Sequence, residues 1–177
     1  MADKTGIQWA DSTPTTLAYL AGMIDGDGFI SIVRSSRGGV VYHAPQVGIA
    51  GTRREPHDLA ASLWGGAVYC YQPKNPDHRA QFQWSRQGTQ AADIIRAIEP
   101  YLLIKRENAW LALELWAHIQ EGRSPDPFPW YGPGFDPSGE RDEMRAMMVD
   151  LNQSRNRLRK KAAGRLLDGR EWSEFPR

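Results

Sequence analysis

The sequence predicts an α+β fold, in which an antiparallel β-sheet has helices packed on one face. Two pairs of alternating polar and apolar segments are each joined across a turn, as in β-hairpins. Segments with helical periodicity lie before, between and after these pairs, in the order α-β-β-α-β-β-α-α. Two successive hairpins favour an antiparallel sheet over the parallel sheet of βαβ proteins.

The first half of the chain is expected to form a helix, a hairpin and a second helix. Thr13 or Thr15 can cap the first helix, and Gly26 and Gly28 are expected to end it. The segment 37–39, Arg-Gly-Gly, is the hairpin turn. The predicted elements are a helix at 15–25, strands at 29–36 and 40–51, and a helix at 55–64.

The second half is expected to form another hairpin and three helices. The hairpin turns at 75–77, Asn-Pro-Asp. Four tryptophans are expected in the core by their position: Trp64, Trp84, Trp110 and Trp116. The predicted elements are strands at 67–73 and 79–86, helices at 89–103 and 105–121, a Pro/Gly-rich linker at 123–139 and a helix at 140–162.

Composition excludes several classes of protein. The 177 residues are 41% hydrophobic and 24% charged, as in globular domains. No run of 18 apolar residues is present and the first residues contain no apolar segment, so neither a membrane span nor a secretory signal is expected. The single cysteine, Cys70, excludes an internal disulfide and is expected to be buried in a strand. A reducing, cytoplasmic location fits best.

The net charge of +1 conceals an uneven distribution. Residues 29–86 carry seven Lys and Arg against three acids, and residues 152–165 carry six against none. The last helix could therefore contact phosphates through its basic end, or be an ordinary solvated helix.

One face of the predicted sheet is polar and aromatic. Such side chains can read the edges of bases, but a solvated sheet face has the same composition, and the residues leave both interpretations open. The residues on this face are Ser31, Ser35, Tyr42, Gln46, Tyr69, Tyr71, Gln81, Gln83 and Ser85.

The segment 20–30, Leu-Ala-Gly-Met-Ile-Asp-Gly-Asp-Gly-Phe-Ile, is the most informative. Ala18, Gly22 and Gly26 recur every four residues, a spacing that lets a second helix approach closely. Asp25 and Asp27 follow near the carboxyl end of the helix, where the helix dipole disfavours negative charge. A nearby divalent cation would relieve that cost, and a carboxylate with a backbone carbonyl suits Mg²⁺.

This segment resembles the signature of the LAGLIDADG homing endonucleases. The match covers nine consecutive positions, with Met23 and Gly26 as the only departures. The predicted order of elements is also that of the family's αββαββα fold. Residues 100–106, Pro-Tyr-Leu-Leu-Ile-Lys-Arg, look like the stretch that places the family's active-site lysine. The resemblance spans residues 14–122, between an amino-terminal arm (1–13), the linker (123–139) and a basic helical extension (140–177).

The resemblance implies an endonuclease that cuts double-stranded DNA at a long, pseudo-palindromic site. Asp27 would bind Mg²⁺ together with the carbonyl of Gly26, and Lys105 would lie near the scissile phosphate. Asp25 would have a structural part. The residue that orders the attacking water stays open among Thr52, Arg53 and Arg54. No organic cofactor and no membrane partner are expected.

Family members with one motif are homodimers, so the resemblance also implies a dimer through Ala18, Gly22 and Gly26. Each sheet would lie in the major groove of the DNA. The alternative is a catalytically silent nucleic-acid-binding protein of the same fold, such as a maturase or regulator. The expected DNA-contacting residues are Ser31, Val33, Ser35, Arg37, Tyr42, Gln46, Tyr69, Tyr71, Lys74, Gln81 and Gln83.

The two ends of the chain resemble a second, unrelated group of proteins. Residues 4–9 and 166–172 look like the beginning and the end of a phage protein family. An endonuclease reading frame inserted into such a gene would explain both ends, and predicts a phage or prophage setting.

Overall fold

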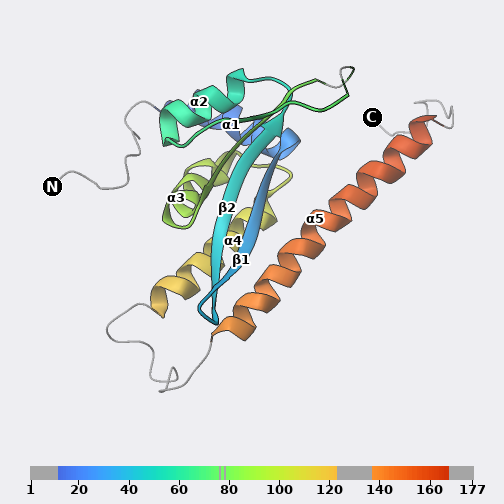
Figure 1. Cartoon of the computed structure of the whole chain (residues 1–177). Coiled ribbons are helices and arrows are strands. Elements are labelled where there is room, and N and C mark those ends of the chain that lie inside the picture. Colours follow the sequence, from blue (N-terminus) through green and yellow to red (C-terminus); the bar gives the residue numbers. More distant parts are fainter. Residues whose placement is uncertain (1–11, 76, 78, 123–136, 168–177) are drawn as a thin grey trace.

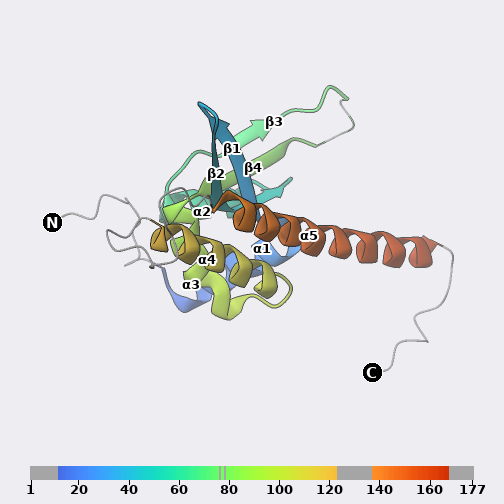
Figure 2. The same ribbon diagram turned by 90° about the horizontal axis from the view of Figure 1, so that it is seen from below.

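The computed structural model describes residues 12–75, 77, 79–122 and 137–167, with residues 155–167 described as backbone only. The sheet forms one layer and helices cover one of its faces (Figures 1 and 2). The elements in chain order are α1 (Pro14–Asp27), β1 (Gly28–Arg37), β2 (Val40–Gly51), α2 (Glu55–Trp64), β3 (Tyr69–Tyr71), β4 (Gln81–Gln87), α3 (Thr89–Ile98), a 3₁₀ turn η2 (Glu99–Tyr101), α4 (Arg106–Glu121) and α5 (Ser138–Leu167).

The four strands form one antiparallel sheet in the order β1-β2-β4-β3. Ile30 pairs with Val47, and Ile49 pairs with Trp84, so these side chains share one face. All four are buried against the helices. The core therefore lies between this face of the sheet and the helices, to which α1, α3 and α4 contribute Leu20, Ile24, Ile94, Ile95, Ile98, Ala109, Ala112 and Leu115.

Local chemistry defines both ends of α1. The hydroxyl oxygen of Thr13 accepts a hydrogen bond from Thr16 N at 3.2 Å, and Pro14 opens the helix, where its missing N–H costs nothing. The helix continues through Gly26 to Asp27, two residues further than expected. A Cβ on Gly28 would lie 2.5 Å from Gly48 O and 2.6 Å from Ile24 Cα, so only glycine fits where α1 passes into the sheet.

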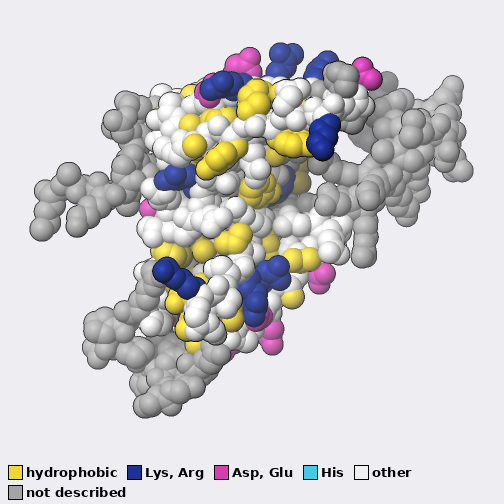
Figure 3. Space-filling view, in the orientation of Figure 1, with side chains coloured by type: hydrophobic (Ala, Val, Ile, Leu, Met, Phe, Trp, Pro, Cys, Tyr) yellow, Lys and Arg dark blue, Asp and Glu magenta, His cyan; other side chains and the backbone are white. Residues whose placement is uncertain are grey.

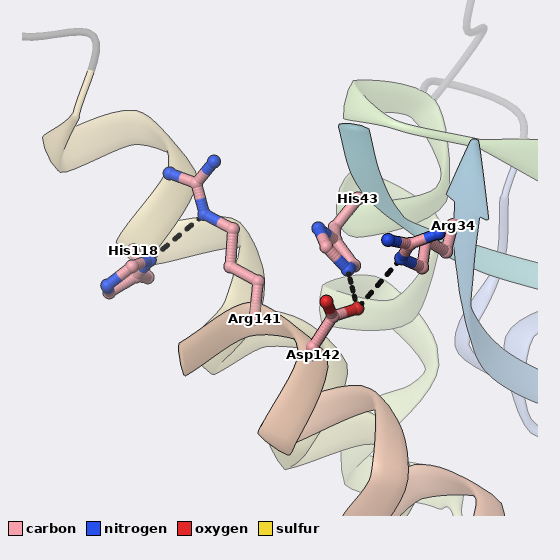
Figure 4. A network of polar contacts seen from close by, with 5 residues as sticks. All are labelled: Arg34, His43, His118, Arg141 and Asp142. Atoms are coloured by element: carbon pink, nitrogen blue, oxygen red, sulfur yellow. Dashed lines mark hydrogen bonds and ion pairs between the residues drawn. The ribbon is translucent and has the colours of Figure 1, made fainter. Parts of the chain in front are cut away.

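Helix α5 lies beside β1 and α4 in the helical layer (Figure 2). Near its start, Asp142 accepts hydrogen bonds from His43 Nε2 at 2.8 Å and from Arg34 Nε at 3.0 Å (Figure 4). Arg141 next to it donates to His118 Nδ1 at 3.2 Å. The hydrogen bond from His43 holds the pKa of Asp142 below its ordinary value, aided by the charge of Arg34.

Several sequence expectations about single elements are wrong. The helix expected over 89–103 ends at Ile98, because Pro100 cannot donate a helical hydrogen bond, and a 3₁₀ turn follows. Strand β3 spans only Tyr69–Tyr71. It lies at the edge of the sheet, so Cys70 is exposed instead of buried.

Trp110 is not a core residue: 59% of it is exposed, and its Nε1 donates to Glu99 Oε1 at 3.0 Å. The last helix begins at Ser138 and reaches Leu167, longer than the expected 140–162. Residues 123–136 of the expected linker, and most of both terminal segments that resemble a phage protein, lie outside the described residues. Among the described helices, none has the length and apolar character needed to cross a bilayer.

Candidate active site and nucleic-acid interface

The carboxyl end of α1 is tied to the start of α4 by a closed set of hydrogen bonds. The Asp25 carboxylate accepts from the backbone N–H of Leu103 (2.7 Å), Ile104 (3.0 Å) and Lys105 (2.9 Å). In return, Lys105 Nζ donates to Ile24 O at 2.7 Å and to Asp25 O. Ile24 O also accepts from the Gly28 N–H that caps the helix, and the ammonium adds a positive charge at the end where the helix dipole favours a cation.

Both members of this pair are inside the protein. Asp25 is 9% exposed and Lys105 is 8% exposed. A buried charge is costly unless it is hydrogen-bonded, and both side chains have backbone partners: three N–H groups for Asp25 and two carbonyls for Lys105. The pair therefore positions the end of α1, and with it the two residues that follow.

Asp27 differs from Asp25, although only one residue separates them. Its side chain is exposed, and within the described part of the chain no side chain or N–H contacts its carboxylate. It stands at the end of a helix, where the dipole disfavours a negative charge. An exposed carboxylate without a partner at this end is available to a cation or to a proton donor.

The oxygens at this end fit a magnesium ion only in part. Gly26, the second expected ligand, is half-buried, and a Cβ placed on it meets nothing within 4 Å. Among the described residues, no group of three or more His, Cys, Asp or Glu side chains could hold a metal ion. Mg²⁺ is typically bound through one or two protein carboxylates, with waters and substrate phosphates as its other ligands. The single Asp27 carboxylate therefore suits an ion whose remaining ligands are waters and phosphates.

The candidate water-ordering residues lie at the same end of the sheet as Asp27. Ile49 pairs with Gly28, and β2 ends at Gly51, so residues 52–54 follow directly. All three are exposed. Arg54 is held by an ion pair between its Nε and Asp58 Oδ2 at 3.0 Å, and the structure does not choose among the three.

The strand register brings the expected DNA-contacting residues of the sheet to one face. Ser31 lies opposite Gln46, Ser35 opposite Tyr42, and Tyr69 opposite Gln83. Ser31 Oγ donates to Gln46 Oε1 at 3.1 Å. Tyr42, Tyr69 and Tyr71 are more than half exposed, and Arg37, Gln81 and Gln83 are exposed too, whereas Val33 is half-buried.

The surface on this side carries both charged and apolar groups. Figure 3 shows Lys and Arg side chains spread over it, with most of the visible acidic side chains near the rim. Lys74 is exposed in the loop after β3 and so lies beside the sheet, not on it. The face is therefore suited to a polyanion whose bases present mixed polar and apolar edges.

The stripe of small residues on α1 faces away from the core of its own chain. Ala18 and Gly22 are exposed, and a Cβ on Gly22 meets nothing within 4 Å. Beside the end of α1, Leu103 is 84% exposed and Ile104 is 57% exposed. No signal in the sequence marks Leu103 and Ile104 as exposed, because apolar residues beside a helix are ordinary in a chain.

No protein-family model matches the sequence, and no curated protein matches it. Solved structures do match. The homing endonuclease I-CvuI, in complex with its target in the presence of Ca, has a TM-score of 0.53 and 22% identity over 77% of this chain and 82% of that chain.

Two further structures agree with it. The archaeal intron-encoded homing endonuclease I-Vdi141I, complexed with DNA, has a TM-score of 0.56 and 12% identity over 77% of this chain and 84% of that chain. The LAGLIDADG homing endonuclease I-SmaMI, bound to cleaved DNA, has a TM-score of 0.53 and 15% identity over 78% of this chain and 44% of that chain.

The fold is that of the LAGLIDADG homing endonucleases. This confirms the predicted fold class, an α+β structure with one four-stranded antiparallel sheet in the described residues. Within this fold, the motif helix is α1, and Asp27 is its last residue.

Proposed function

We propose that this chain is a metal-dependent, site-specific endonuclease that cuts double-stranded DNA and acts in homing. The observation that carries the proposal is the exposed Asp27 carboxylate at the end of the motif helix, which has no hydrogen-bond or ion-pair partner among the described residues. It lies next to the sheet in a fold shared with DNA-bound homing endonucleases. An unpaired carboxylate at the carboxyl end of a helix lowers the stability of the fold. Unfavourable local features of this kind are expected at functional sites.

Binding to DNA is assigned to the uncovered face of the sheet. The exposed Gln and Tyr side chains of β2, β3 and β4 would contact base edges, while Arg37 and Lys74 would contact phosphates. A two-stranded ribbon fits the width of the major groove. The polar face therefore has a use beyond solvation.

The proposed assembly is a homodimer through α1. Small residues at 18, 22 and 26 let two helices approach closely, and the space outside Gly22 is open. Leu103 and Ile104 add an exposed apolar area at the same end. Pairing two copies would bring a second Asp27 to the site, whereas the described residues of one chain contain no group of three or more side chains that could hold a metal ion.

In the proposed mechanism, the Asp27 carboxylate and the Gly26 carbonyl would hold Mg²⁺. When bound, the ion supplies charge neutralisation at the phosphate and lowers the pKa of the attacking water. Asp25 and Lys105 hold the end of α1 so that Asp27 keeps its place. We also assign Lys105 to the vicinity of the scissile phosphate: its ammonium, bonded to Ile24 O and Asp25 O, would stabilise developing negative charge from that position by its field, with Thr52, Arg53 or Arg54 ordering water.

The test combines a target search with a single substitution. A randomised duplex library is incubated with the protein and either Mg²⁺ or EDTA, and the cut ends are sequenced. We expect cuts at one long, near-palindromic site with Mg²⁺ alone. Asp27→Asn should abolish cutting on that site and leave binding within a few-fold of the unmodified protein, since the amide is isosteric but a poor cation ligand.

A matched control is Asp150→Asn, which removes an exposed carboxylate from α5 and should leave cutting unchanged. Cutting by the Asp27→Asn protein would contradict the assignment of the metal-binding residue. Selective retention of one sequence without cuts, in either buffer, would instead support the silent nucleic-acid-binding protein.

A further inference from the structure

Helix α5 has a fixed course along the body of the domain. Asp142 binds Arg34 and His43, which pair with each other near the turn between β1 and β2. Ten residues later, Asn152 Nδ2 donates to Ile30 O at 3.3 Å, and its Oδ1 accepts from Asn108 Nδ2 at 3.2 Å. The helix therefore runs antiparallel to β1. It begins beside the hairpin turn and continues toward the start of β1, next to Asp27.

Among the side chains of α5 that the structure describes, Asn152 is the last that is hydrogen-bonded to the rest of the domain. Met148, one turn earlier, is 1% exposed and packs against the core. The backbone helix continues from residue 153 to Leu167, a further length of about 22 Å at 1.5 Å per residue. Figures 1 and 2 both show this last part extending beyond the sheet and the other helices.

The sequence of the extending part is strongly basic. Between residues 152 and 165 there are six Lys and Arg and no acid. The helix dipole explains cations only in the final turn of a helix, but these charges begin at Arg155, three turns before the end. Like charges at helical spacing destabilise a helix, so a polyanion beside it would relieve a real cost.

We propose that residues 155–165 of α5 form an arm that binds the phosphate backbone of duplex DNA outside the surface of the sheet. This inference rests on the proposed function in one respect, that the ligand is duplex DNA. The polar anchors at Asp142 and Asn152 direct the arm past the Asp27 end of the domain. The arm adds affinity that depends on salt and not on base sequence.

The test measures the affinity for a short duplex of arbitrary sequence, without divalent metal, at several salt concentrations. The full chain is compared with a variant in which Arg155, Arg157, Arg159, Lys160 and Lys161 are all changed to Gln. Glutamine forms helices nearly as well as these residues, so the length of the helix is kept. Circular dichroism and the thermal-unfolding midpoint check that the fold is unchanged.

Each phosphate contact contributes about 0.9 to the slope of log K against log salt. We expect the slope of the variant to be smaller by about 1.8 or more, the loss of at least two contacts. The matched control, Arg96→Gln on α3, removes an exposed cation that is paired with Asp93 and should leave the slope unchanged. A second variant that ends at residue 154 also lacks Arg165 and should lose at least as much of the slope as the Gln variant.

If the full chain and both variants have the same slope of log K against log salt, the proposal that residues 155–165 bind DNA is wrong. A weaker dimer in sedimentation with an unchanged slope would show that the segment contacts a second copy instead, and would also overturn it. The proposed function fails separately, if the library yields neither cuts nor a selected sequence while the arm still changes the salt dependence.

Discussion

At the scale of single residues, the motif contains two aspartates in opposite environments. Asp25 is buried and accepts three backbone hydrogen bonds from the loop before α4. Asp27 is exposed, and among the described residues it has no partner. The first carboxylate therefore holds the structure together, while the second is retained at a cost to stability.

This difference predicts opposite results for the same substitution. Asp25→Ala removes the acceptor of three N–H groups and should lower the free energy of unfolding by about 3 kcal/mol. Asp27→Ala removes an exposed charge from an unfavourable helix end and should change it by less than about 0.5 kcal/mol, toward higher stability. Denaturant unfolding of both variants in metal-free buffer measures the two values.

Equal losses for the two variants would mean that the hydrogen bonds of Asp25 contribute little. Asp25→Asn separates charge from geometry, since one amide oxygen can still accept. Its stability should lie between those of the unmodified protein and Asp25→Ala.

At the scale of elements, α1 has two faces that tolerate substitution differently. Leu20, Ala21 and Ile24 are fully buried in the core, whereas Gly22 faces open space. Gly28, at the end of the same helix, is in contact with the backbone of Ile24 and Gly48. Glycine at 28 is required by the fold of one chain, while glycine at 22 is not.

Substitution at Gly22 therefore tests the dimer without damaging the monomer. Gly22→Leu should be at least as stable as a monomer, because leucine is a better helix former than glycine by roughly 0.8 kcal/mol. It should sediment as a monomer and lose both DNA cutting and tight binding, since a large side chain cannot enter a close helix crossing.

Gly28→Ala serves as the contrasting variant. Its methyl group would meet backbone atoms at 2.5 and 2.6 Å, so it should destabilise the fold by about 2 kcal/mol. A Gly22→Leu protein that still forms a cleaving dimer would show that the interface is elsewhere.

At the scale of the whole molecule, α5 extends the domain and is attached through polar contacts. The Asp142 side chain is 42% exposed, while the His43 side chain that it binds is fully buried. The pKa of Asp142 is held below its ordinary value by the hydrogen bond from His43 and by Arg34. A carboxylate with a lowered pKa in the folded state stabilises that state at neutral pH, and the stabilisation is lost as the pH falls through that lowered pKa.

The attachment of α5 should therefore weaken in acid. Asp142→Asn should lower the hydrogen-exchange protection of α5 amides at neutral pH relative to the unmodified protein. The difference should shrink as the pH falls through the acidic range, because protonation removes the same charge in the unmodified protein. Asp150→Asn, an exposed position on the same helix, is the control and should show no such difference at any pH.

Much of the fold followed from local pattern. Alternation predicted the sheet, since a strand with one buried face repeats every two residues, and all expected elements from α1 to α5 are present in order. Errors occurred where the environment decides the outcome. Trp110 is apolar in any helical pattern, but its position at the outer side of α4 leaves it exposed, with its N–H bonded to Glu99.

The sequence by itself determined the motif, the order of elements and the polar face of the sheet, because periodicity and side-chain chemistry are properties of neighbouring residues. Only the tertiary structure decided which partners each aspartate has, that Leu103 and Ile104 stand exposed beside α1, and where α5 runs. These features join residues about 80 to 120 positions apart, as in Asp25 with Leu103 and Ile30 with Asn152. Contacts at such separation depend on how the elements pack, and no local pattern encodes them.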